Sequence, residues 1–173
     1  MLLNPELLEG RVNSEKRREI ITTHYDSVSS EEARLITEIL ERHMTGYEIS
    51  RHEAQKEIHS QTEVSGELAE AILLTETRSI QMLETVRKYQ RENVLRSIRW
   101  MGPDDGDVFP ACREVENIVE ERGGSIPLNE LQGLLREKAE KYAEEGGTPE
   151  RMDHWVPHEK CRYSMSPVAG PSK

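Results

Sequence analysis

The sequence predicts a mainly α-helical protein with a small α+β lobe near its C-terminus, in which long helices precede a short antiparallel sheet closed by Cys and His residues. Charged residues make up 32% of the 173 residues and aromatic residues 5%, so helices with charged outer faces are favoured over a large aromatic core. Apolar residues recur at helical spacing through the first half of the chain, and a short segment that alternates apolar and polar residues follows. This order indicates helices first and a strand after them. We expect a helical region over 1–93, an α+β Cys/His lobe over 94–166 and a loose tail over 167–173.

Short helices with clear start signals are expected first. Residues 14–27 can open with a helix, and residues 30–44 place apolar side chains at helical spacing. Ser29 and Glu32 form a capping-box pair before the second helix, in which each side chain bonds the backbone N–H of the other residue. The same Ser-x-x-Glu signature recurs in residues 50–53, before the next helical stretch.

The longest helical signal runs from residue 65 to residue 93, with no proline inside it. A mostly apolar stripe recurs there at helical spacing, at Leu68, Ala71, Ile72, Thr75, Ile80, Leu83, Val86 and Tyr89. Such a stripe faces either the protein's own core or a neighbouring subunit. The sequence leaves both interpretations open.

A strand and a tight turn are predicted after the long helix. Residues 94–102 place Val94, Ile98 and Trp100 on one face under period-two spacing, which favours a strand. Glycine, proline and aspartate then crowd residues 102–106, a composition typical of a turn.

Two helices and an extended end complete the expected fold. Residues 112–122 are expected to form a short helix closed by glycines, and Pro127 suits the first position of a helix over 128–145. Four prolines interrupt residues 148–173. Because proline cannot continue a helix, we expect this segment to be irregular or extended.

Net charge restricts the classes of partner. Asp and Glu number 33 against 23 Lys and Arg, for a net charge of −10, which opposes strong direct binding to DNA. There are 7 Lys and hence 23 − 7 = 16 Arg, an acidic, Arg-rich balance that suits a halophilic source or an ordinary acidic protein. No segment approaches the roughly 20 consecutive apolar residues of a membrane-spanning helix, so neither membrane anchoring nor secretion is expected.

Cysteine and histidine spacing gives the most informative candidate site. Cys112 follows an Asp-rich turn, and His154, His158 and Cys161 lie close together downstream. Zinc favours four imidazole and thiolate ligands in a tetrahedron, and a small irregular lobe gains folding energy from such a site. These four residues are the candidate zinc ligands.

Two other interpretations of the cysteines stay open. A disulfide between Cys112 and Cys161 would close a long loop and contribute roughly 2–4 kcal/mol in an oxidising environment. Alternatively, both thiols are small buried apolar groups and the histidines are surface residues.

No enzymatic activity is predicted, because the sequence lacks a Gly-rich phosphate loop, a nucleophile elbow and an HExxH pair. His52 and His59 are seven residues apart and could share a helical face, but a satisfied or solvent-facing pair is the favoured interpretation. Asp104, Asp105 and Asp107 could bind a divalent cation, although an acidic turn is more often simply solvated.

Three segments, taken in order, resemble the C-terminal domain of the Mu F-like minor head proteins of tailed viruses. TETRSIQMLETVRKY from Thr75 matches the family's Thr-Glu helix. IRWMGPDDGDVFPAC from Ile98 matches its strand ending in Trp, its acidic turn and its Cys-x-x-Cys. HEKCR from His158 matches its His-Pro-x-Cys-Arg-Cys close. The resemblance covers roughly residues 50–166.

Two cysteines of the family pattern are replaced in this chain. The first cysteine of the family pair falls on Phe109, and the last cysteine of the close falls on Tyr163. If the family site is a metal site or a cysteine cross-link, the resemblance implies that this chain keeps Cys112, His158 and Cys161 of it. His154 is then the substitute for a fourth ligand.

The resemblance implies a minor virion structural protein, docked at the portal or inner capsid and assisting head assembly, genome packaging or ejection. Its implied partners are the portal protein, the major capsid protein or both, with multiple copies in a ring or at one vertex. It would be in the virion, and in the host cytoplasm during assembly. The alternative is a small zinc-binding nucleic-acid regulatory protein, whose basic surface would have to come from residues 16–18 and 87–91.

Overall fold

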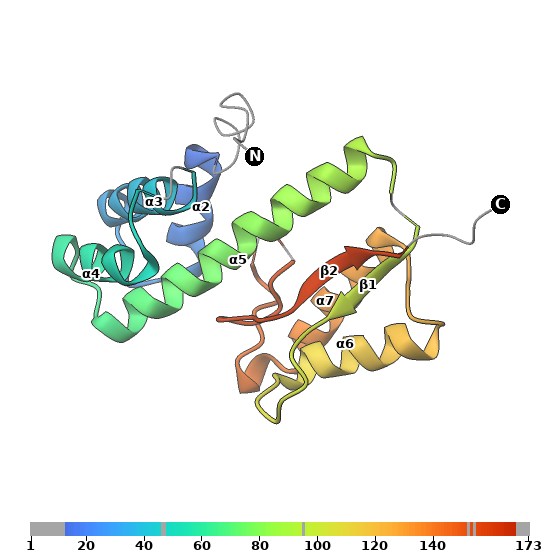
Figure 1. Cartoon of the computed structure of the whole chain (residues 1–173). Coiled ribbons are helices and arrows are strands. Elements are labelled where there is room, and N and C mark those ends of the chain that lie inside the picture. Colours follow the sequence, from blue (N-terminus) through green and yellow to red (C-terminus); the bar gives the residue numbers. More distant parts are fainter. Residues whose placement is uncertain (1–12, 46–47, 95, 152, 154, 169–173) are drawn as a thin grey trace. The chain divides into compact units, whose positions relative to one another are not determined.

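The computed structural model describes residues 13–45, 48–94, 96–151, 153 and 155–168 (Figure 1). Over these residues the protein is mainly α-helical, with a two-stranded antiparallel sheet formed by its late segments, so the predicted fold class is confirmed. The chain divides into two compact units, residues 1–80 and 81–173. The division falls inside helix α5 (Gly66–Arg91), which contributes to both units. The division predicted from sequence followed the end of this helix, at residue 93.

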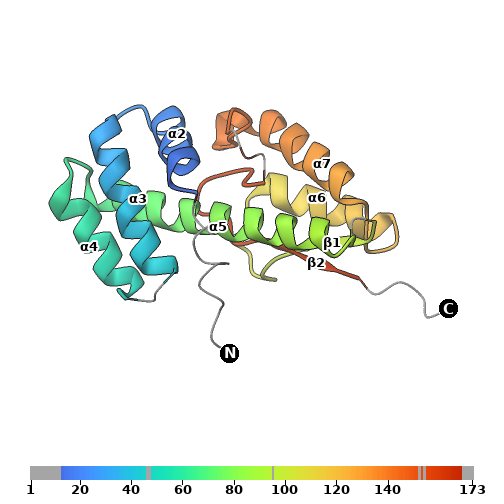
Figure 2. The same cartoon turned by 90° about the horizontal axis from the view of Figure 1, so that it is seen from above.

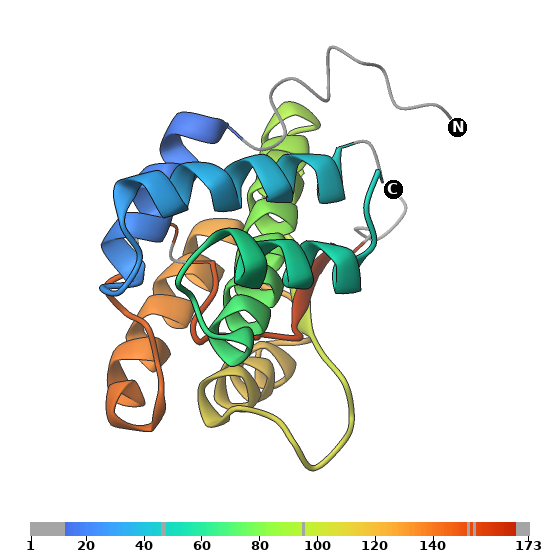
Figure 3. The same cartoon turned by 90° about the vertical axis from the view of Figure 1, so that its left-hand side faces the viewer.

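Between residues 13 and 61, the described part of the first unit forms α2 (Ser14–His24), α3 (Ser30–Met44) and α4 (Arg51–Gln61), all shorter than α5. Both predicted capping boxes are present, at the starts of α3 and α4. Figure 3 shows α3 and α4 side by side and running in opposite directions, and α2 also packs on α3.

The core of the first unit is aliphatic. Its buried residues include Ile21, Ile36, Leu40, Ile58, Ile72 and Leu73. The apolar stripe predicted on α5 is used inside the protein, because Ile72, Ile80, Val86 and Tyr89 are all buried in the chain itself. The alternative of a free face for a neighbouring subunit is therefore wrong for these side chains.

A buried polar network links α2 to α5 in the first unit. Arg17 Nη1 donates to Glu76 Oε2 at 2.6 Å and to Ser79 Oγ at 2.8 Å, and the Tyr25 hydroxyl donates to Glu76 Oε1 at 2.9 Å. Arg17 and Glu76 are 2% and 0% exposed. The central residue of the basic cluster at residues 16–18 is therefore buried and adds no positive charge to the surface.

The second unit is built on strands β1 (Ile98–Met101) and β2 (Ser164–Pro167), which pair antiparallel with Trp100 opposite Met165. Ile98 and Trp100 are buried while Arg99 and Met101 are exposed, so the predicted alternation is confirmed. The strand is shorter than the predicted 94–102, because the Val94 N–H bonds the Tyr89 carbonyl at the end of α5.

Helices α6 (Pro110–Glu121) and α7 (Leu128–Lys141) pack against each other and both contact β1 (Figure 2). Helix α6 begins two residues before the predicted start, since a proline suits the first helical position. Pro127 precedes α7 as its N-cap residue and is not its first helical residue. A short 3-10 turn, Ala143–Glu145, follows α7.

The segment predicted to be irregular or extended supplies β2, and the Val168 N–H bonds the Ser97 carbonyl just beyond it. The rest of the predicted tail, 169–173, lies outside the described residues. No helix in the described part of the chain combines the length and the apolar character needed to cross a membrane.

Candidate metal centre

Cys112, His158 and Cys161 meet in the second unit. One potential ligand atom from each lies within 4.8 Å of the others, and the two sulfurs are 3.7 Å apart. Cys112 comes from the first turn of α6, and the other two come from the segment that leads into β2. The fourth predicted ligand, His154, lies outside the described residues.

The separation of the two sulfurs fits a shared metal ion better than a bond. Two thiolates at about 2.3 Å from a tetrahedral zinc ion are roughly 3.8 Å apart. A disulfide requires about 2.05 Å. At 3.7 Å, the pair has the spacing of two metal ligands, and both cysteines are free thiols. The three residues therefore form a group that could hold a metal ion such as zinc.

The His158 ring is oriented by two neighbours. Its Nδ1 lies 2.8 Å from the Glu159 carbonyl oxygen, to which it donates, and this leaves Nε2 as the nitrogen for a metal. The ring of Phe109 stacks on the imidazole, with centroids 4.3 Å apart and planes inclined by 23°. A ligand histidine whose second nitrogen bonds a backbone carbonyl is typical of zinc sites.

Electrostatics separate the two thiols. The hydrogen bond to Cys161 and burial raise the pKa of Cys112, whereas the hydrogen bond from Cys112 and the neighbouring His158 lower the pKa of Cys161. Because they share a proton, the two sulfurs titrate as a pair. Cys161 is thereby favoured as the thiolate, which is the form that binds metal.

Aromatic packing supports the segment that carries Cys161. The Tyr163 ring stacks on Trp100 with centroids 5.4 Å apart, and its hydroxyl donates to Glu116 at 2.6 Å. Burial raises the pKa of Tyr163, so it stays a donor. Gly102 is required here because a side-chain carbon at this position would overlap the Tyr163 ring.

The predicted acidic turn is held by an ion pair. Arg162 donates to both carboxylate oxygens of Asp105 at 2.8 Å and also to the Asp107 carbonyl. Hydrogen bonding to Arg162 lowers the pKa of Asp105. The turn after β1 is thus tied to the residue next to Cys161, a structural use that the sequence analysis had not assigned to it.

The histidines of α4 do not join a metal-ligand group among the described residues. His59 Nδ1 donates to the Val64 carbonyl at 2.8 Å, so this side chain closes the end of its own helix, while His52 is exposed. The interpretation of a satisfied or solvent-facing pair is confirmed.

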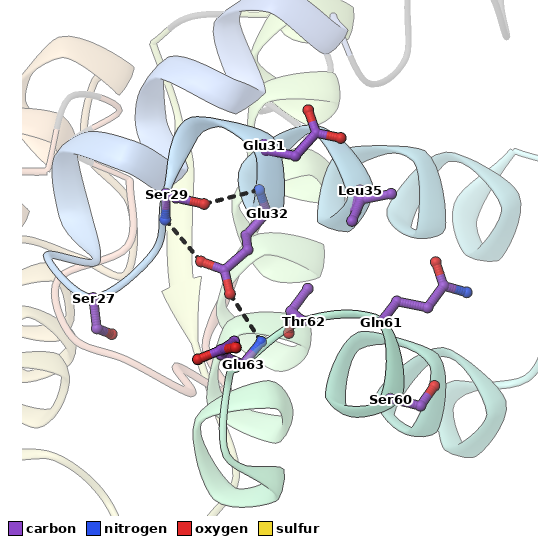
Figure 4. Close-up of a pocket in the computed structure, with 9 residues that line it drawn as sticks. All are labelled: Ser27, Ser29, Glu31, Glu32, Leu35, Ser60, Gln61, Thr62 and Glu63. Atoms are coloured by element: carbon purple, nitrogen blue, oxygen red, sulfur yellow. Dashed lines mark hydrogen bonds between the residues drawn. The ribbon is translucent and has the colours of Figure 1, made fainter.

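A surface hollow of about 650 Å³ lies in the first unit (Figure 4). Its polar lining holds local structure together: Glu32 accepts from the Ser29 and Glu63 N–H groups, each at 2.9 Å, and Glu31 pairs with Arg34. Figure 4 shows Glu32 reaching from the start of α3 toward Glu63. These contacts account for two of its three carboxylates without any ligand.

Sequence reasoning identified the three meeting residues but missed what positions them. Phe109 and Tyr163 entered only as replaced cysteines, and the pairing of Arg162 with Asp105 was not anticipated. Proximity in sequence was the available signal, because Phe109 lies three residues before Cys112 and Tyr163 two residues after Cys161.

No protein-family model matches this chain, and neither does any curated protein or solved structure. The resemblance to Mu F-like proteins therefore depends on the motifs quoted above.

Proposed function

We propose that the protein is a minor structural protein of a tailed virus particle, docked at the portal or inner capsid, and that Cys112, His158 and Cys161 bind a zinc ion in its second unit. The observation that carries the proposal is the meeting of the late motifs behind the resemblance. These motifs are far apart in sequence, yet their side chains contact one another in the second unit.

Three contacts join these motifs. Trp100 in β1 stacks on Tyr163, the acidic turn pairs with Arg162, and Cys112 faces Cys161. These residues depend on one another for packing, which gives a physical reason for the motifs to occur together in one chain. This supports a common fold with the family that the motifs resemble.

The earlier motif has a structural role as well. Glu76, from the Thr-Glu pair, is fully buried and accepts hydrogen bonds from Arg17 and Tyr25. Thr75 beside it is also buried. Each motif thus serves folding, which suits a structural protein.

Zinc is the metal favoured by the donor set. Two thiolates and an imidazole are borderline-soft ligands, which suit zinc better than magnesium or calcium. The site joins α6 to the segment before β2, and a two-stranded sheet is marginal on its own in water. Metal binding would therefore stabilise the second unit.

The zinc part is tested by native mass spectrometry and metal analysis of the purified full chain. The expected result is one zinc per chain, lost on Cys161→Ser and on His158→Ala. His52→Ala is the matched control, because His52 is an exposed histidine outside the site, and it should keep the metal. A folded wild-type chain without zinc after zinc loading would contradict this part.

The particle part is tested by locating the labelled protein in purified virus particles. Density at a single vertex supports portal docking, and uniform decoration of the shell would instead indicate a capsid-lattice role. Absence from the particles would overturn the assignment.

The rival class, a nucleic-acid regulator, needs a basic patch that survives folding. One candidate cluster loses Arg17 to the buried ion pair with Glu76. Binding of duplex DNA with a steep salt dependence would favour the regulator and contradict the structural role.

A further inference from the structure

Cys112 and Cys161 are the only cysteines of the chain. They are 0% and 3% exposed and face each other at 3.7 Å. Burial shields each sulfur from the thiols of other protein molecules, and the two sulfurs have each other as the nearest thiol partner. Oxidation of either one is therefore directed to the other.

We propose that these two sulfurs form a redox-controlled metal switch, in which they hold zinc while reduced and form a Cys112–Cys161 disulfide, with release of zinc, when a peroxide oxidises them. The inference rests on the zinc binding proposed above and adds its regulation. The zinc site and the disulfide become alternating states of one site.

The chemistry balances with a peroxide as the oxidant. One thiolate attacks hydrogen peroxide, takes up one oxygen as a sulfenic acid and leaves hydroxide, which a proton converts to water. The second sulfur attacks the sulfenic sulfur, the S–S bond forms and the hydroxyl group leaves as water after protonation. In total two thiolates give up two electrons, and the peroxide and two protons become two water molecules. Zinc leaves because neither sulfur is any longer a thiolate ligand.

The geometry makes the two states mutually exclusive. Zinc requires the sulfurs at roughly 3.8 Å, and the disulfide requires about 2.05 Å, so oxidation draws them together by roughly 1.7 Å. Cys112 is fixed in the first turn of α6, whereas Cys161 lies in the connection between the turn at residues 159–160 and β2. The approach is therefore expected to come from the Cys161 segment.

The switch has a consequence for the proposed particle role. In a reducing cytoplasm the second unit would be held by zinc, and outside the cell it would be held by a covalent bond that no chelator can remove. Both links join the same two segments, so the fold is kept while the means of holding it changes.

The test treats the zinc-loaded full chain with hydrogen peroxide. Zinc is followed with a chromophoric chelator, and the denatured chain is weighed by mass spectrometry without reductant. The expected result is release of one zinc per chain together with the loss of two hydrogens, both reversed by dithiothreitol and added zinc. His158→Ala should form the disulfide with little or no bound zinc, and Cys161→Ser should never lose two hydrogens.

The outcomes separate this inference from the proposed function. A chain that binds zinc but gains oxygen atoms on peroxide treatment, or keeps its zinc, would overturn the switch and leave the zinc site standing. A chain that forms the disulfide but never binds zinc would overturn both the switch and the zinc part of the proposed function. Neither result bears on its location in the particle.

Discussion

Both units of the protein bury an arginine–carboxylate ion pair, Arg17–Glu76 in the first and Arg151–Asp153 in the second, but their cores otherwise differ. The first buries its ion pair between helices, beside a core in which Tyr25 is the only buried aromatic side chain among the described residues. The second contains both tryptophans, the Trp100–Tyr163 stack and the two cysteines in one core. Both units depend on contacts between segments that are distant in sequence, because helix stability in proteins comes mostly from tertiary packing. These contacts are an ion pair between helices in the first unit, and a ring stack and a thiol pair in the second.

The largest effect is expected at the buried ion pair. Arg17→Met leaves the Glu76 carboxylate buried without its cation and should lower the free energy of unfolding of the first unit by about 3–5 kcal/mol. Urea unfolding followed by circular dichroism measures it. Arg34→Met, in an exposed pair with Glu31 and Glu38, is the matched control and should have a far smaller effect. Equal losses in the two variants would refute the special contribution of the buried ion pair to the first unit.

Metal removal should weaken the second unit selectively. With zinc at 100–1,000 times its dissociation constant, binding adds about 2.7–4.1 kcal/mol to the folded state. Trp100 and Trp155 are the only tryptophans and both lie in the second unit, so their fluorescence reports on it alone. A chelator should shift this transition in the wild type but not in Cys161→Ser. A shift in both proteins would exclude the proposed ligands.

Loss of the stacked ring should reduce metal affinity without removing a ligand. Phe109→Ala frees the His158 ring and is expected to weaken zinc binding roughly 10–100-fold, the range for residues that orient metal ligands. Competition with a chromophoric chelator measures the change. Phe109→Trp keeps an aromatic face and should restore most of the affinity, whereas failure of this rescue would indicate that stacking is not the cause.

The smallest effect is expected at the exposed ion pair of Asp105 and Arg162. Arg162 lowers the pKa of Asp105 in the folded state below its value of about 3.9 in the unfolded chain. The ion pair therefore stabilises the folded state above about pH 3.9, and this stabilisation is lost as the pH falls through the lower pKa of the folded state. Asp105→Asn should therefore be slightly less stable than the wild type at neutral pH and equal to it in strong acid. Thermal unfolding across this range, with Asp104→Asn as control, tests the sign.

The helices could be predicted closely from the sequence because their signals are local. The Ser29 and Ser50 capping boxes fix helix starts within three residues of sequence. The alternation around Trp100 likewise marks a strand and its buried face. Each signal comes from neighbours along the chain, which the sequence contains in full.

The sequence by itself determined the fold class, the order of the elements and the candidate ligands Cys112, His158 and Cys161, with His154 as a fourth. Only the tertiary structure decided that these three meet, that their sulfurs are 3.7 Å apart, and that Phe109 and Arg162 position them. It also decided that Arg17 is buried with Glu76 instead of forming a basic surface patch. The reason is physical: the contacts join residues 47 to 59 positions apart in the chain, and no local pattern encodes which distant side chains come together when the core closes.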